Sequence, residues 1–71
     1  MIPYNNGLSG VRAYEYGEDW IIIEFKTTRK HYKYTYPSAG AHNVEKMKQL
    51  ADAHSGLNRY IMKHVRNLYV K

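Results

Sequence analysis

Cysteine is absent from this chain of 71 residues, which excludes a disulfide framework and a thiolate metal site. The longest apolar run, Trp20 to Ile23, is far too short to span a bilayer, so no membrane partner is expected. The first residues, Met1 to Asn6, show no basic region followed by an apolar run, so we expect no signal peptide. A cysteine-free chain without a signal peptide is consistent with a cytoplasmic location.

Acidic residues are also few. Six Asp and Glu stand against eleven Lys and Arg, giving a formal net charge of +5. From Met1 to Phe25 the chain has four acidic residues and one basic residue, Arg12, whereas from Lys26 onward it has ten basic and two acidic residues. Such an imbalance favours a polyanionic partner, of which nucleic acid is the commonest. The alternative is that these charges only keep the protein soluble.

The periodicity of the chain changes once. Alternating or β-rich stretches predict three antiparallel strands in a meander, at Val11–Tyr16, Trp20–Lys26 and Arg29–Tyr36, the last ended by Pro37. From Asn43 the apolar residues follow helical spacing, with a break at Ser55-Gly56 and a second helix from Leu57 to Leu68. The predicted fold class is therefore α+β, a three-stranded antiparallel β-meander followed by two helices packed on one face.

The chain is short enough to form one domain. We expect a flexible N-terminal segment over residues 1–8 and a single domain over residues 9–71.

The strand register decides which side chains face the helices. A three-residue turn at Gly17 to Asp19 would pair Tyr14 with Ile22, and a four-residue loop from Thr27 to Lys30 would pair Ile23 with Tyr34. This register turns Tyr32, Tyr34 and Tyr36 towards the helices as core rings, although a stacking platform for bases is the alternative.

The same register leaves the other face of the sheet open. Aromatic and basic side chains would alternate there, an arrangement that single-stranded RNA binders use: Arg12, Tyr14, Trp20, His31 and Lys33. A second copy of the chain, giving a homodimer, or another protein could cover this face instead, because exposed apolar patches usually mark interfaces.

The second helix carries a basic stripe. Arg59, Lys63 and Arg66 lie on the side opposite the apolar residues, and no acidic residue follows Asp52. This stripe could lie along phosphates, or it could be an ordinary solvated helix face.

Catalytic and metal sites are poorly supported, so we predict a non-enzyme without cofactor or metal. The four histidines are scattered, and two of them without a carboxylate partner make an incomplete zinc site. The sequence also has no glycine-rich phosphate loop and no nucleophile elbow.

One set of motifs resembles a known family. Ser9-Gly10-Val11-Arg12-Ala13, Tyr32-Lys33-Tyr34 and Gly56-Leu57-Asn58-Arg59-Tyr60-Ile61 together resemble the KTSC domain, over about Ser9 to Tyr69. That domain occurs at the C-terminus of some lysyl-tRNA synthetases and as free-standing bacterial or phage proteins, and the synthetase association implies RNA binding. Lys26-Thr27-Thr28-Arg29 departs from the family pattern, because it replaces a tight Asn-Gly-type turn with a longer, more basic loop.

The sequence therefore predicts a small binding module for nucleic acid, with RNA as the first expected partner. The alternative is a protein-interaction or oligomerisation module that buries the Trp20 face of the sheet.

Overall fold

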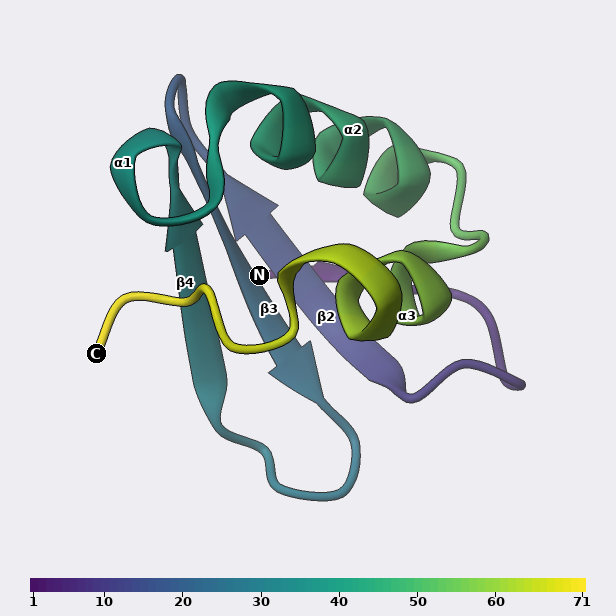
Figure 1. Ribbon diagram of the computed structural model, residues 1–71. Coiled ribbons are helices and arrows are strands. Elements are labelled where there is room, and N and C mark those ends of the chain that lie inside the picture. The colour runs from purple at the N-terminus through teal and green to yellow at the C-terminus, as the bar shows by residue number, and fades with distance from the viewer.

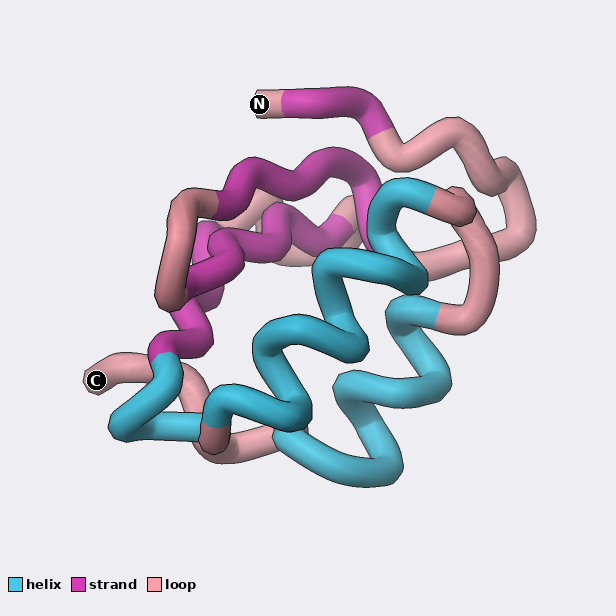
Figure 2. The backbone as a smooth tube through the Cα atoms, turned by 90° about the horizontal axis from the view of Figure 1, so that it is seen from above, coloured by secondary structure: helices cyan, strands magenta, loops and turns pink.

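One antiparallel sheet organises the computed structural model, which describes residues 1–71 (Figure 1). Its strands lie side by side in chain order: β1 (Ile2–Pro3), β2 (Val11–Tyr16), β3 (Trp20–Phe25) and β4 (His31–Thr35). The helices cover one face of this sheet, as the view from above shows (Figure 2). The α+β class and the meander are confirmed, but the sheet has four strands where three were predicted.

The additional strand comes from residues that the sequence analysis placed outside the domain. Ile2 pairs with Tyr14 and Pro3 pairs with Ala13, so β1 extends the edge of the sheet beyond β2. Tyr4 follows with only 4% of its surface exposed, and its hydroxyl accepts a hydrogen bond from the Leu57 N–H at 3.3 Å. A two-residue strand has no periodicity that a sequence could show, which is why it was missed.

The helical part begins earlier than the change of period indicates. Helix α1 (Tyr36–Ala39) follows β4 directly, because Thr35 and Ser38 form a capping box: each side chain binds the backbone N–H of the other. Helix α2 (Ala41–Asp52) then begins two residues before the expected start at Asn43. The predicted third strand, Arg29–Tyr36, is correspondingly shortened.

The predicted second helix is present but irregular. Helix α3 (Leu57–Tyr60) continues without a break into a π-helix, η1 (Ile61–Val65). Leu57, Ile61 and Val65 are fully buried along one side. Leu68 was expected to extend this apolar side, but it lies beyond the helix and is 42% exposed.

The register between β2 and β3 differs from the prediction by one residue. The turn is Glu18-Asp19 alone, closed by a hydrogen bond from the Gly17 N–H to the Trp20 carbonyl oxygen at 3.1 Å. Tyr14 therefore pairs with Ile23 rather than Ile22. Because side chains alternate along a strand, this shift moves Tyr14 from the expected open face to the helix-covered face. A β-bulge between Val11 and Ala13 keeps Arg12 on the outer face, where it pairs with Glu24.

The loop between β3 and β4 is longer than the four residues expected. Arg29 has a φ of 56°, in the left-handed region, and its N–H binds the Phe25 carbonyl oxygen at 2.9 Å. With this turn, the strand pair nearest the loop is Glu24 with His31, so Ile23 pairs with Tyr32 rather than Tyr34. A register shift of two residues leaves each side chain of β4 on the same face of the sheet, so the tyrosines of β4 still point towards the helices.

Tyr34 confirms the prediction of a core ring, since only 1% of its surface is exposed, whereas Tyr32 and Tyr36 are half-buried against the core. Tyr69, from the segment after η1, packs edge-on against Tyr32 and Tyr34 with ring centroids 4.8 and 6.3 Å away. The Val70 N–H also binds the Lys33 carbonyl oxygen at 2.7 Å, so this C-terminal segment lies against β4. No helix of the structure has both the length and the apolar character needed to cross a membrane.

The inward turn of Tyr14 has a consequence at high pH. Burial, aided by the hydrogen bond to Asp52 at 3.0 Å, raises the pKa of Tyr14 from 10.0 to about 12. The unfolded chain therefore loses this proton first, and stability should fall as the pH rises from about 10 to about 12. Urea denaturation of wild type and Tyr14→Phe across this range checks the effect. The loss should be smaller in the variant, and equal losses in both proteins would contradict it.

Candidate nucleic-acid interface

The residues predicted to bind nucleic acid fall on two opposite sides of the molecule. The outer face of the sheet, away from the helices, carries Arg12, Trp20, His31 and Lys33. Arg59, Lys63 and Arg66 are exposed on the helical side, and Tyr14 is 3% exposed in the core. The structure therefore does not bring the predicted residues together in one site, and Tyr14 cannot stack on a base.

Carboxylates partly neutralise the outer face. Glu24 holds the Arg12 guanidinium at 3.0 Å and lies 3.7 Å from the His31 ring. The N-terminal ammonium group of Met1 lies 4.0 Å from Glu15. Cations that already have a carboxylate partner attract a polyanion less, because the local field is partly cancelled.

The expected aromatic patch on this outer face is reduced to one ring. The Trp20 indole folds back over Gly17, where a Cβ atom would overlap it, and it is only half-buried. The Lys33 ammonium lies 5.3 Å from the centre of the indole, in a cation–π contact. Ile22 beside it is also half-buried. The outer face is therefore less apolar and less basic than the sequence predicted.

The cations of the helical side are free of such partners. None of the four ion pairs in the protein includes Arg59, Lys63 or Arg66. The same holds for Arg29 and Lys30, which are exposed in the β3–β4 loop. Five cations without carboxylate partners thus come from two segments far apart in the sequence.

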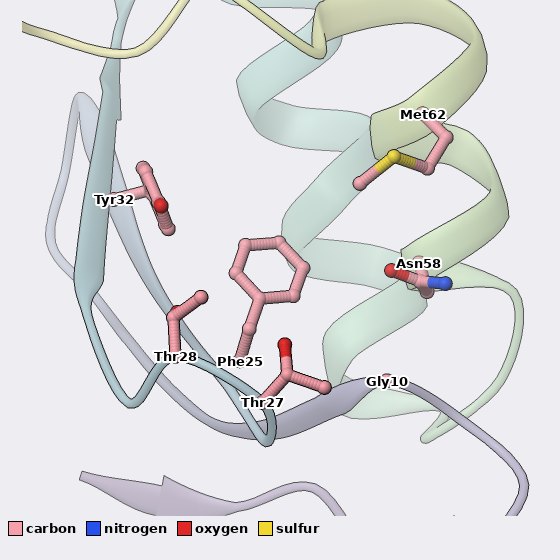
Figure 3. A pocket seen from close by; sticks show the side chains of 7 residues that line it. All are labelled: Gly10, Phe25, Thr27, Thr28, Tyr32, Asn58 and Met62. Atoms are coloured by element: carbon pink, nitrogen blue, oxygen red, sulfur yellow. The ribbon is translucent and has the colours of Figure 1, made fainter.

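A pocket of about 350 Å³ joins these two segments (Figure 3). It lies between the β3–β4 loop and the helical segment and is lined by Gly10, Phe25, Thr27, Thr28, Tyr32, Asn58 and Met62. The Phe25 ring is placed between Tyr32 on one side and Asn58 and Met62 on the other (Figure 3). Phe25 and Tyr32 meet edge-to-face, with centroids 5.4 Å apart and planes at 66°.

A second pocket, of about 260 Å³, continues the first past Asn58, which lines both. Its other lining residues are mostly polar: Asn6, Leu8, Ser9, Gly56 and Arg59. The Lys26 ammonium lies beside it, 3.5 Å from the carbonyl oxygen of Asn6 and 3.4 Å from that of Gly7. We call the two pockets together the loop–helix groove.

Acidic groups gather at the other end of the sheet, around the β2–β3 turn. Glu45 accepts hydrogen bonds from Lys48 at 2.8 Å and from the Tyr36 hydroxyl at 2.6 Å, and both lower its pKa. Lys48 also donates to the carbonyl oxygen of Glu18 at 2.8 Å. The β3–β4 loop is at the opposite end of β3, so acidic and basic groups are separated along the sheet.

Comparison with known proteins adds no assignment: no protein-family model, curated protein or solved structure matches this chain. The resemblance to the KTSC domain therefore stays a prediction from the motifs. The structure also contains no group of three or more His, Cys, Asp or Glu side chains placed to hold a metal ion.

One predicted binding residue, Arg59, lines the groove, and the basic Lys26–Arg29 loop predicted from the sequence lies next to it. Lys63 and Arg66 line neither pocket. The place of Phe25 and Tyr32 at a surface pocket was not predicted, because apolar residues at strand spacing are usually core. The role of Met62, which lies off the predicted apolar side of the helix, was not predicted either. The one feature of the sequence that could have indicated this pocket is the basic loop that directly follows Phe25.

Proposed function

We propose that this protein is a non-enzymatic cytoplasmic module that binds single-stranded RNA in the loop–helix groove. The observation that carries the proposal is an aromatic pocket between two segments that carry unpaired cations. Thr27 and Thr28 line the pocket from the β3–β4 loop, which continues into the exposed Arg29 and Lys30. Arg59 lines the adjoining pocket from α3. Basic grooves with aromatic side chains are the usual means of binding single-stranded nucleic acid.

The motifs shared with the KTSC domain are consistent with this proposal. Gly56 begins α3 with a φ of 79°, a conformation that glycine adopts without strain. Leu57 and Ile61 of the same motif are buried, whereas Asn58 and Arg59 line the groove. The motif therefore combines a structural role with side chains that are available to a ligand. We propose on this basis that the chain is a KTSC-like domain.

The proposal predicts a strong dependence of RNA affinity on salt. Each phosphate contact in a single strand contributes about 0.7 to the slope of log K against log salt concentration. With four to five cations engaged, we expect a slope of about −3. Fluorescence anisotropy of a labelled single-stranded RNA of about ten nucleotides, titrated at several salt concentrations, measures this slope.

The same samples distinguish the alternative function. Light scattering should show a monomer that binds the RNA. A dimer that dissociates on the substitution Trp20→Ala and does not bind RNA at low salt would instead establish an association module that uses the outer face of the sheet. A slope near zero would contradict the proposed function in either case.

A further inference from the structure

We propose that the first pocket of the loop–helix groove receives one unpaired base, while the second pocket holds the adjoining sugar-phosphate. This inference rests on the proposed RNA-binding function and specifies how the strand lies in the groove. It assigns a binding role to Phe25, Tyr32, Asn58 and Met62.

The walls of the first pocket suit a flat, apolar surface. Phe25 and Tyr32 pack against the core with one side and leave the other side to the pocket. Met62 faces them from η1 and is 48% exposed, although it lies directly after the fully buried Ile61. A flexible thioether opposite two rings can close on a planar group of varied shape. The volume of about 350 Å³ lies within the range of small-molecule sites.

Polar groups at the rim could bind the edge of a base. No hydrogen bond within the protein uses the Asn58 side-chain amide, which therefore offers two donor hydrogens and an acceptor oxygen. Thr27 adds a hydroxyl group at the same rim, and the Thr28 hydroxyl already accepts from the Lys30 N–H at 3.2 Å. Amides and hydroxyls with unused hydrogen-bond donors and acceptors can bind the Watson–Crick edge of an exposed base.

The second pocket has the opposite character and suits the backbone of the strand. Leu8 is its one apolar residue, and Arg59 contributes a guanidinium group without a carboxylate partner. The Lys26 ammonium is held beside it by the carbonyl oxygens of Asn6 and Gly7. A phosphate in this pocket would meet two cations. Because Asn58 separates the two pockets, a base in the first adjoins a phosphate in the second.

The requirement for a base can be tested with oligonucleotides of equal charge. Single-stranded oligouridine of about ten nucleotides is compared with an abasic ribose-phosphate chain of the same length. We expect the abasic chain to bind about tenfold more weakly, which corresponds to one stacked base. Equal affinities would overturn the base pocket and leave the proposed function intact. Failure of both oligomers to bind at low salt would overturn the proposed function itself.

The position of the base is tested with two matched variants. Met62→Ala removes a pocket residue and Leu68→Ala removes a side chain that is similarly exposed, 42% against 48%, but does not line the groove. Met62→Ala should weaken oligouridine binding about fivefold and leave the abasic chain unaffected, and Leu68→Ala should change neither. Both substitutions are at the surface, and circular dichroism verifies that both variants fold. A Met62→Ala variant that binds oligouridine like wild type would show that the base stacks elsewhere.

Two further readouts use the protein's own groups. The side-chain amide signals of Asn58 in nuclear magnetic resonance spectra should shift with oligouridine and not with the abasic chain. Poly-glutamate serves as a competitor that carries charge without bases. If it displaced oligouridine at equal charge concentration, the groove would be a site for acidic proteins, and the base pocket would be overturned.

Discussion

Replacing Tyr4 with alanine should lower the free energy of unfolding by about 3–5 kcal/mol, the range for removing a large aromatic side chain from a core. The ring is 4% exposed and meets Tyr14 edge-on at 6.4 Å and His54 at 5.6 Å. Its hydroxyl also accepts the hydrogen bond from the N–H of Leu57, the first residue of α3. Small domains have free energies of unfolding of about 5–15 kcal/mol, so this one change could unfold much of the protein.

Two comparisons separate the contributions of the ring. Tyr4→Phe keeps the ring and leaves the Leu57 N–H without its partner, so it should cost about 1–3 kcal/mol. Leu8→Ala alters a fully exposed side chain of the same segment and should change stability by less than about 0.5 kcal/mol. Urea denaturation followed by circular dichroism measures all three variants. If Tyr4→Ala were as stable as Leu8→Ala, residues 1–8 would be dispensable for the fold.

The N-terminal segment also shows where prediction from the sequence ended. Strands β2, β3 and β4 have enough residues for an alternating pattern, so their order and direction could be predicted. Ile2–Pro3 is too short for such a pattern, and the burial of Tyr4 depends on α3, some fifty residues further on. Contacts of that kind are set by tertiary packing and leave no local signal.

Turn length had a larger effect on the predicted site than on the fold. A single residue fewer in the β2–β3 turn moved Tyr14 into the core, whereas the two-residue shift at the β3–β4 loop changed no face. Both register errors left the predicted fold correct, because the inward-facing residues of β3 are the same in either register. The error between β2 and β3 made the predicted aromatic interface wrong, because that interface required Tyr14 on the outward side of β2. The site was therefore less predictable than the architecture.

Of the groove, only the charge of one wall was predictable from the sequence. The basic stripe that includes Arg59 follows from helical spacing and from the absence of acidic residues after Asp52. That the β3–β4 loop lies across from Asn58 and Met62 follows from the packing of α3 and η1 on the sheet, which a sequence pattern does not specify. Met62 lies off the apolar side formed by Leu57, Ile61 and Val65, and it is 48% exposed at the pocket.

Neutralising Arg59 in α3 and Arg66 directly after η1 should reduce RNA affinity strongly while preserving the fold. The double variant Arg59→Gln with Arg66→Gln removes two exposed charges that have no carboxylate partner. If each contacts one phosphate, the slope of log K against log salt concentration should become shallower by about 1.4. Near 0.1 M salt this corresponds to about a 20-fold loss of affinity. Anisotropy titrations at several salt concentrations provide both quantities.

The matched variant removes the same charge from the outer face of the sheet. Arg12→Gln with Lys33→Gln lowers the net charge equally, so it controls for long-range attraction. Arg12 is already paired with Glu24 at 3.0 Å, and Lys33 lies over the Trp20 indole, so neither cation is as free as those of the helix. We expect affinity to fall less than threefold and the salt slope to change by less than about 0.7.

Trp20 adds an independent indicator of which face is occupied. It is the only tryptophan of the chain, and it lies on the side of the sheet away from the groove. RNA in the loop–helix groove should leave its emission nearly unchanged, whereas RNA stacked on the outer face should quench it. Strong quenching together with a larger effect of Arg12→Gln/Lys33→Gln would move the interface to the outer face. Weak quenching together with a larger effect of Arg59→Gln/Arg66→Gln would place it on the side of the groove, where the unpaired Arg59 adjoins the aromatic pocket.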